Sequence, residues 1–377
     1  MTNREVVLLG AGHTHLHVLR RWRQRGPAGA HLTCISNFDT ATYSGMLPGV
    51  LAGQYPPGAM EIALEPLCRV AGATLIVDEV SAVDLTHPHV ALSDGRRVPF
   101  DLLSVGVGSI ASQGDARFVA DAPVVSIKPM QTFLARLRRC LGRIDISDGN
   151  ATVRLVVVGG GAAGVEVALC VLPFAIANVG GDARVECTLV TSATLVGDGT
   201  GVARRSRRAL ERAGVRVLEG RRVVAVEADR VVLDDDTDVA AGVVLWTTAA
   251  APAPILRRLA LPTDEAGFLL TTDSLQSTAD PRVFAVGDCG SLVSTATAKA
   301  GVYAVRQGPV LLENLCRAIT GAAPRAFSPQ ARFLRLLNTG DGRAIGDWRG
   351  LSFEGRWCWY LKDAIDRRFV GRYRMAG

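Results

Sequence analysis

The sequence predicts an α/β fold of two similar parallel-sheet units, the second inserted in the first, followed by a small C-terminal region. Two glycine turns predict the units: Gly10-Ala11-Gly12 and Gly159 to Gly164 each follow an apolar run. As a third observation, each unit later contains an apolar strand that is followed directly by small residues, at 101–109 and at 243–250. Because both halves repeat the same order of features, the pattern indicates a duplication at the level of the fold.

Each glycine turn is predicted to hold a dinucleotide. An apolar strand, a glycine turn and a helix in this order let backbone N–H groups approach a pyrophosphate at the helix N-terminus. One such motif is weak evidence, because short glycine patterns recur by chance. Two of them indicate two Rossmann-like dinucleotide-binding domains, and electron transfer between the dinucleotides is the natural reason to hold both.

The order of the remaining elements gives the expected domains. A strand at 5–9, a helix to about residue 25 and a strand at 31–36 precede a loop at 37–54. Late in the chain, the strand 283–286 ends in Gly287-Asp288, and a helix is expected from about 296 to 319. The predicted bounds are 1–123 and 268–330 for the first domain, 124–267 for the second, and 331–377 for a basic, aromatic C-terminal region.

Composition and charge favour a soluble enzyme. With 377 residues, 48% of them hydrophobic, the chain is long enough for two or three domains with ordinary cores. No run approaches the roughly 20 apolar residues of a membrane helix, and no charged-then-apolar leader precedes the first strand. Eight scattered cysteines without a CxxC pair are typical of a reducing cytoplasm. The net charge of +6 is concentrated in the tail, so no basic domain face predicts nucleic-acid binding.

The two turns, the two crossover strands and the late Val283-Phe284-Ala285-Val286-Gly287-Asp288 resemble the two-dinucleotide-binding-domain flavoproteins. These form the pyridine nucleotide-disulfide oxidoreductase superfamily, and the chain is most similar to its branch of type II NADH dehydrogenases and sulfide:quinone reductases. The segments 10–15, 43–49 and 299–309 look like the FAD-dependent oxidoreductase that is found alone or fused to selenophosphate synthetase.

This resemblance implies FAD on the first turn, NAD(P)H on the second, and hydride transfer between them. It implies a quinone or similar small molecule as the electron acceptor, and an oligomer and a peripheral position on the inner face of the membrane are open. Asp288 is expected to bind the flavin ribitol. The helix after Lys299 is expected to direct its N-terminal dipole at the flavin pyrimidine edge, with Lys299 either reinforcing that charge or solvated.

The turns and the resemblance together give the predicted site residues. On the FAD side these are Gly10, Gly12, His13, Thr14, Ser36, Asn37, Pro48, Val80, Gly106, Gly108, Gly287, Asp288, Lys299 and Ala300. On the nicotinamide side they are Gly159, Gly161, Ala162, Ala163, Gly164, Glu166, Thr191 and Ala249. Glu166 and Lys299 are also the predicted catalytic residues. For Glu166, proton handling and simple electrostatics in the first helical turn are both open.

No metal site is expected, because His13, His15 and His17 are two residues apart at a helix start and point about 200° away from each other. For His13, contact with FAD and plain packing are both open. His15 occupies the place of the third glycine of the first turn. An acid that would bind the ribose is missing after the second strand, so Ser36 or Asn37 must substitute for it.

The sequence leaves NADH and NADPH open. The strand 185–190 ends in Thr191-Ser192, without the acid that favours a 2′-hydroxyl. Downstream, the run Arg204 to Arg208 is either a grip for a 2′-phosphate or a solvated helix face.

Cysteine positions bear on the reaction type. The segment 43–53 has no cysteine pair, which argues against disulfide reduction. A sulfur or selenium chemistry would need Cys140, Cys289 or Cys316 beside the flavin, and packing at a turn is the alternative for Cys289. A flavin-bearing redox sensor or interaction protein is a further alternative.

In the tail, apolar residues recur every four positions, as one stripe if the segment is helical. They are Trp357, Leu361, Ile365, Phe369 and Tyr373. Cations lie mostly off this stripe, so it is predicted either to bind a membrane surface or to pack on protein.

Overall fold

The computed structural model describes residues 4–145, 151–180, 183–196 and 201–374. Its first parallel sheet has five strands in the order of a doubly wound fold, and the glycine turn follows the central strand. In order across the sheet, the strands are β22 (Val283–Ala285), β9 (Leu102–Val105), β1 (Arg4–Leu9), β2 (Ala30–Ser36) and β5 (Thr74–Val77).

The second parallel sheet repeats this arrangement around its own glycine turn. Its strands, in order, are β12 (Val124–Ser126), β19 (Val243–Trp246), β13 (Thr152–Val158), β14 (Arg184–Thr191) and β15 (Arg216–Glu219). The α/β fold with two Rossmann-like sheets is therefore confirmed. The exact domain bounds stay a prediction, since β11 (Arg117–Phe118) already pairs with β16 (Val223–Val226) beside the second sheet.

Smaller sheets extend both units and connect them. In the first unit they are β3 (Thr40–Thr42) with β4 (Glu61–Ala63), β6 (Val80–Asp84) with β7 (His89–Leu92) and β8 (Arg97–Pro99), and β21 (Leu269–Thr271) with β23 (Gly290–Leu292). In the second unit, β17 (Arg230–Leu233) and β18 (Asp238–Ala240) continue from β16. The connection is β10 (Ser109–Ala111), which pairs antiparallel with β20 (Ala250–Pro252). The two small-residue segments that leave the sheets therefore meet each other.

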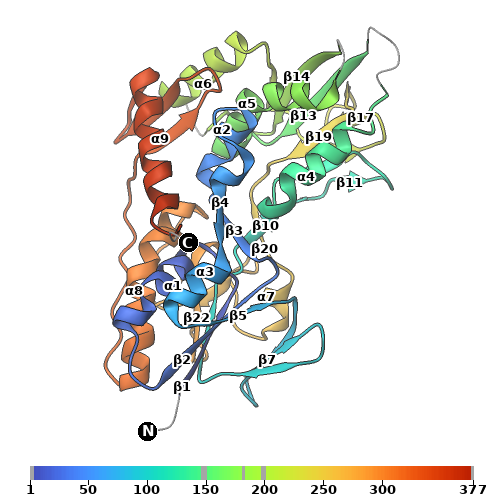
Figure 1. The fold of residues 1–377 in the computed structure, drawn as a ribbon. Helices are drawn as coiled ribbons and strands as arrows, with labels where there is room; N and C mark the ends of the chain where they lie inside the picture. The colour runs from blue at the N-terminus through green and yellow to red at the C-terminus, as the bar shows by residue number, and fades with distance from the viewer. Residues whose placement is uncertain (1–3, 146–150, 181–182, 197–200, 375–377) are drawn as a thin grey trace.

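Helices pack around both parallel sheets (Figure 1). The helices in the described residues are α1 (His13–Arg25), α2 (Leu47–Leu51), α3 (Leu64–Ala71), α4 (Met130–Leu141), α5 (Ala162–Val179), α6 (Gly201–Arg212), α7 (Ile255–Arg258), α8 (Gly301–Thr320) and α9 (Arg356–Gly371). Short 3₁₀ turns are η1 (Ser44–Met46), η2 (Pro57–Met60) and η3 (Gly287–Cys289).

Two expected element bounds are wrong. The segment 37–54 is not a loop, because it contains β3, η1 and α2. The helix expected from about 296 begins at Gly301, so Lys299 precedes it in extended chain.

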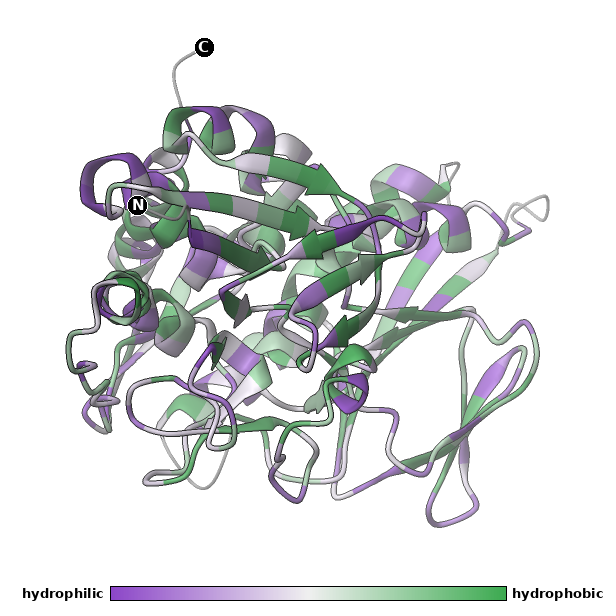
Figure 2. Cartoon of the chain, turned by 90° about the horizontal axis from the view of Figure 1, so that it is seen from below, coloured by the Kyte–Doolittle hydropathy of each residue, from purple (hydrophilic) through white to green (hydrophobic). Residues whose placement is uncertain are grey.

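Buried strands explain why the sheets form. Val6, Val7 and Leu8 of β1 and Val156 and Val157 of β13 are fully buried, as expected for parallel strands with both faces covered. Figure 2 shows many central strands coloured mostly hydrophobic, whereas hydrophilic and hydrophobic segments alternate along the helices.

Helix α5 is the one described helix that is long and apolar enough to span a membrane, although the sequence led us to expect none. Half of it is buried in the protein. It begins at the second glycine turn and packs against β14, as a core helix of a Rossmann-like domain does.

The C-terminal region forms a sheet of β24 (Arg335–Asn338), β25 (Ala344–Trp348) and β26 (Leu351–Gly355) that is followed by α9. It packs on α5 and α6 of the second unit, with α9 along one side of the molecule (Figure 1).

The single apolar stripe predicted for this helix is wrong. Phe369 and Tyr373 are buried, whereas Trp357, Leu361 and Ile365 are 56%, 38% and 43% exposed. A residue advances by about 100° around a helix, so a spacing of four drifts by roughly 40° at each step. The predicted stripe therefore winds from solvent at its start to the core at its end.

Candidate active site

The two glycine turns open onto one cavity of about 1610 Å³ between the two parallel sheets, which we call the interdomain cavity. Pockets for a single small ligand are typically about 300–1,000 Å³, so this one has room for more than one ligand. Every predicted site residue except Gly164 lines it. Their individual roles remain predictions, but the structure brings them together.

The first glycine turn is shaped by close backbone contact. A Cβ on Gly10, whose φ is +86°, would lie 2.8 Å from the Gly106 carbonyl oxygen, and one on Gly12 would lie 2.9 Å from it. Gly12 is the N-cap of α1 and no side chain caps the helix. An uncapped helix N-terminus on a glycine cradle fits the pyrophosphate of a dinucleotide.

His15 replaces the usual third glycine through a compensation on the facing strand end. Its Nδ1 lies 2.5 Å from the Gly10 carbonyl oxygen and its Nε2 lies 2.8 Å from Ser104 Oγ. A Cβ on Gly106 would lie only 2.5 Å from the imidazole ring. The space for the ring therefore comes from Gly106, and burial lowers the pKa of His15 to about 4.

The second turn has the complete set of glycines. Gly159 has a φ of +121°, and a Cβ on Gly164 would clash with the Gly159 carbonyl oxygen. Gly164 therefore allows helix and strand to pack closely instead of lining the cavity. Gly161 is the N-cap of α5, again without a side-chain cap, so this end of the cavity fits a second pyrophosphate.

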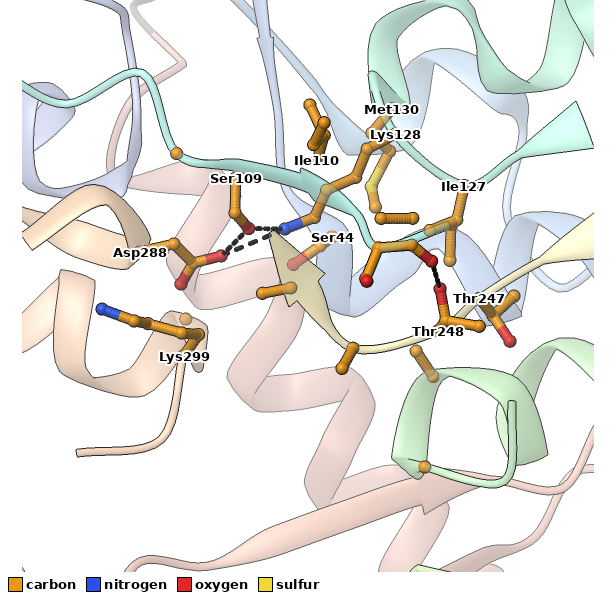
Figure 3. Close-up of a pocket in the computed structure, with 18 of the residues that line it drawn as sticks. Ser44, Ser109, Ile110, Ile127, Lys128, Met130, Thr247, Thr248, Asp288 and Lys299 are labelled. Atoms are coloured by element: carbon orange, nitrogen blue, oxygen red, sulfur yellow. Dashed lines mark hydrogen bonds and ion pairs between the residues drawn. The ribbon is translucent and has the colours of Figure 1, made fainter. Parts of the chain in front are cut away.

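Asp288 lies where the two units meet. It follows β22 of the first sheet and accepts hydrogen bonds from Ser109 Oγ at 2.6 Å and Lys128 Nζ at 3.0 Å (Figure 3). Lys128 follows β12 of the second sheet and also contacts Ser109. Burial raises the pKa of Asp288, but Lys128 and Ser109 outweigh it, so the net shift is downward and the carboxylate stays charged.

Lys299 lines the cavity, but its ammonium group is directed elsewhere. It donates to the Gly290 carbonyl at 2.7 Å and to Ser291 Oγ at 3.2 Å, and it lies 4.0 Å from the centre of the Phe268 ring. Figure 3 shows its side chain extending away from Lys128. The cation bound to Asp288 is therefore Lys128, and burial lowers the pKa of Lys299.

Glu166 is not in the first turn of its helix, which contains no acid. It lies one turn later, where Oε1 accepts a hydrogen bond of 2.8 Å from the Asn338 backbone N–H and lies 4.0 Å from Lys362 Nζ. Burial raises its pKa to about 7, against the opposing effects of Lys362 and of the Asn338 N–H. Simple helix-start electrostatics therefore does not describe it: it is a buried acid that exchanges a proton near neutral pH.

Lys362 connects Glu166 to a further acid and a tyrosine. Its Nζ donates to Asp366 Oδ2 at 2.9 Å and to the Gly45 carbonyl at 2.7 Å, and Tyr43 donates to Asp366 Oδ1 at 3.0 Å. We call Glu166, Lys362, Asp366 and Tyr43 the acid network. Burial lowers the pKa of Lys362, but Glu166 and Asp366 outweigh it, and the net shift is upward.

His13 lies between the first glycine turn and this network. Its ring is 5.5 Å from the Tyr43 ring and 5.4 Å from the Phe369 ring. Burial lowers its pKa to about 4, so it is neutral at pH 7, and its Nε2 has no hydrogen-bond partner within the described residues. A buried nitrogen in this position fits a polar atom of a bound ligand better than plain packing does.

The predicted site residues omit Lys128, Ser109, Lys362, Asp366 and Tyr43. The pair Lys362 and Asp366 has a local signal, since oppositely charged residues four apart lie on one helix face. Lys128 follows a short strand and precedes a proline, which is no specific signal.

Known proteins share this architecture. Residues 4–308 match the pyridine nucleotide-disulphide oxidoreductase family. Type II NADH:quinone oxidoreductase NdhA of Mycobacterium tuberculosis is 26% identical over 399 residues, which cover 98% of this chain and 84% of that protein.

Two solved structures have the same fold at lower identity. The structure of sulfide:quinone oxidoreductase from Aquifex aeolicus aligns with a TM-score of 0.80 at 17% sequence identity. The alignment covers 98% of this chain and 91% of that chain. The structure of NDH2 from Plasmodium falciparum in complex with NADH aligns with a TM-score of 0.80 at 13% sequence identity. The alignment covers 98% of this chain and 97% of that chain. These two structures show that the chain shares their fold. By its family match over residues 4–308, the chain thus belongs to the pyridine nucleotide-disulphide oxidoreductase family, as an FAD-dependent dehydrogenase of NAD(P)H.

Proposed function

We propose that this enzyme oxidises NAD(P)H and reduces a quinone-like small molecule in the interdomain cavity. The observation that carries the proposal is that both glycine turns and Glu166 face the same cavity. Bound FAD supplies the two-electron chemistry between the nicotinamide and the acceptor. The turns at Gly10 and Gly159 orient the two dinucleotides, and Asp288 binds a sugar hydroxyl of the first.

The acid network supplies protons to the acceptor. Reduction of a quinone to a quinol consumes two protons, and a carboxyl group with a pKa near 7 exchanges protons efficiently at neutral pH. Glu166 has such a pKa and lines the cavity. Lys362 keeps Asp366 close to Glu166 and holds the η1 segment through the Gly45 carbonyl.

We further propose that the enzyme binds to a membrane surface, where quinones dissolve. The C-terminal region exposes large apolar side chains, which we call the apolar patch: Trp348, Leu351, Trp357, Tyr360, Leu361 and Ile365. Arg349 and Arg356 lie in the same segment, and apolar side chains beside cations are what an interfacial element requires.

Thiol chemistry has less support. Cys289 Sγ lies 3.1 Å from the Val105 carbonyl oxygen and is buried, and burial raises its pKa to about 11. Cys140 and Cys316 contact other backbone carbonyls, and all eight cysteines are free. A thiolate is needed for sulfur or selenium chemistry at the flavin, and this environment disfavours it.

Anaerobic stopped-flow absorbance tests the proposed function. The holoenzyme is mixed with NADH or NADPH, and the bleached flavin is then mixed with a soluble quinone. Bleaching by either nucleotide followed by rapid reoxidation by the quinone supports the proposal, and many fast turnovers argue against a redox sensor. A flavin that neither nucleotide bleaches would overturn it.

A further inference from the structure

The end of β14 lies beside the second glycine turn and contains no acid. A Cβ on Gly160 would lie 2.5 Å from Thr191 Oγ1, so the last residue of the strand touches the turn. In a dinucleotide-binding domain, this strand end faces the adenosine ribose, and an acid there selects the 2′-hydroxyl of NADH. Here the residues after the strand are Ser192, Ala193 and Thr194, and all three line the cavity.

The acid at the end of the neighbouring strand is engaged elsewhere. Glu219, the last residue of β15, accepts a hydrogen bond of 2.7 Å from Arg207 Nη2 and one of 3.2 Å from the Leu195 backbone N–H. It does not line the interdomain cavity. Among the residues that the structure describes, neither strand end thus offers a free carboxylate to a ribose hydroxyl.

Two arginines follow the neighbouring strand β15, beside the end of β14. The Arg221 backbone N–H donates to the Thr191 carbonyl at 3.0 Å, and both Arg221 and Arg222 line the cavity. The Arg221 guanidinium pairs with Asp235 at 2.8 Å. Arg222 uses only its backbone: its N–H donates to Asp234 Oδ1 at 3.1 Å, and its carbonyl accepts from the Asp234 N–H at 2.9 Å. Within the described part of the chain, the structure shows no hydrogen bond or ion pair for its side chain.

Resting on the function proposed above, we infer that the enzyme prefers NADPH to NADH, and that Arg222 with the Ser192 hydroxyl binds the 2′-phosphate. A guanidinium group is planar and binds phosphate oxygens in pairs, and it stays charged at any physiological pH. Its exposed side chain is free to turn toward the phosphate. A hydroxyl at Ser192 adds a donor on the side of the glycine turn.

The run Arg204 to Arg208 does not provide this grip. None of the five residues lines the cavity. Arg205 Nη2 donates to the Ser352 carbonyl at 3.2 Å and Arg207 pairs with Glu219, so α6 uses these cations to hold the C-terminal region and β15. The arginines that matter for the nucleotide come after β15.

Calorimetric titration of the holoenzyme with 2′,5′-ADP and with 5′-AMP tests the inference without catalysis. These probes share the adenosine and differ in the 2′-phosphate. We expect 2′,5′-ADP to bind at least about 10-fold more tightly, and Arg222→Ala to remove the difference while 5′-AMP binding is unchanged. Arg222→Lys should keep part of it, because the charge remains but the paired contact is lost. Arg208→Ala, from the run on α6, is the matched control and should keep the full ratio.

The outcomes separate this inference from the proposed function. Two results would overturn the inference: equal affinities of the wild type for the two probes, or an Arg222→Ala variant that still binds 2′,5′-ADP as much more tightly than 5′-AMP as the wild type does. If NADH then bleaches the flavin in the stopped-flow experiment, the proposed function stands without it. If neither nucleotide bleaches the flavin, the proposed function fails, whatever the probes show.

Discussion

Lys128 Nζ lies 3.0 Å from Asp288 Oδ2, and this ion pair joins the first strand of the second sheet to the last strand of the first. The side chains are 30% and 17% exposed, so water screens the pair only in part. Because both residues line the interdomain cavity, the pair links one unit to the other at the cavity wall.

Lys128→Met should therefore lower the free energy of unfolding by about 1–2 kcal/mol, because Asp288 loses a charged partner in a partly buried place. Urea unfolding measures this. Arg4→Met is a suitable control, since Arg4 and Asp101 form a pair of 2.9 Å whose side chains are 52% and 36% exposed. That variant should lose far less stability. If both variants lose the same free energy of unfolding, the Lys128–Asp288 pair stabilises the protein no more than an exposed ion pair does.

Glu166→Gln should change how stability depends on pH. The folded protein holds the Glu166 proton more tightly than the unfolded chain, since the pKa rises from 4.5 to about 7 on folding. Protonated Glu166 therefore adds to the free energy of unfolding. This contribution, of about 3 kcal/mol, is complete below pH 4.5 and is lost as pH rises to about 7. In the Gln variant this part of the slope should vanish. Exposed Glu265→Gln is the control and should leave the slope in place.

The same variant tests the acid network in turnover. Flavin reoxidation by a soluble quinone should slow as pH rises through about 7 in the wild type, because Glu166 then loses its proton. In Glu166→Gln the rate should be lower by about 100-fold and flat between pH 5 and 9. Stopped-flow reoxidation over this range measures both features. If the variant shows the same pH dependence of flavin reoxidation as the wild type, Glu166 does not supply the proton.

Gly106→Ala should destabilise the protein by about 1–3 kcal/mol, because the new methyl group would overlap the His15 ring. In a double variant with His15→Ala, the loss should be smaller than the sum of the two single losses, since the ring is gone. Thermal unfolding measures the four proteins. Gly371→Ala has open space at its Cβ and serves as the control. Additive losses would contradict the proposed compensation.

Leu351→Ser with Trp357→Ser should reduce binding to anionic phospholipid vesicles by at least about 10-fold, because each large apolar side chain contributes about 1.5–3 kcal/mol when buried. These residues are 72% and 56% exposed. Vesicle sedimentation measures binding. The control, Val293→Ser with Ile176→Ser, changes residues that are 63% and 60% exposed outside the C-terminal region. If the control loses as much binding, the apolar patch is not the contact.

Local features of the sequence were enough to locate the two glycine turns and the helices that follow them. A strand, a glycine turn and a helix are coded by neighbouring residues, so Gly10, Gly12, Gly159 and Gly161 were identified without the fold. Asp288 was identified because the motif around it resembles a known family.

Contacts between distant segments were not predictable in this way. Lys128 reaches Asp288 across 160 positions, and Glu166 accepts from Asn338 across 172. Neither partner has a local pattern, because tertiary packing alone brings them together. The raised pKa of Glu166 likewise follows from burial by the C-terminal region, which periodicity in that region did not indicate.

The position of α9 has a consequence for biosynthesis. A ribosome makes the chain from its N-terminus, and domains generally fold as they emerge. Both glycine turns are complete long before Lys362 and Asp366 leave the ribosome, so a nascent chain can assemble its cofactor cradles while Glu166 still faces water. The Asn338 N–H of β24 and Lys362 of α9, which lie against that acid in the folded protein, come last in the chain. Maturation therefore has a natural order, in which the two glycine turns form first and the surroundings of Glu166 are completed last.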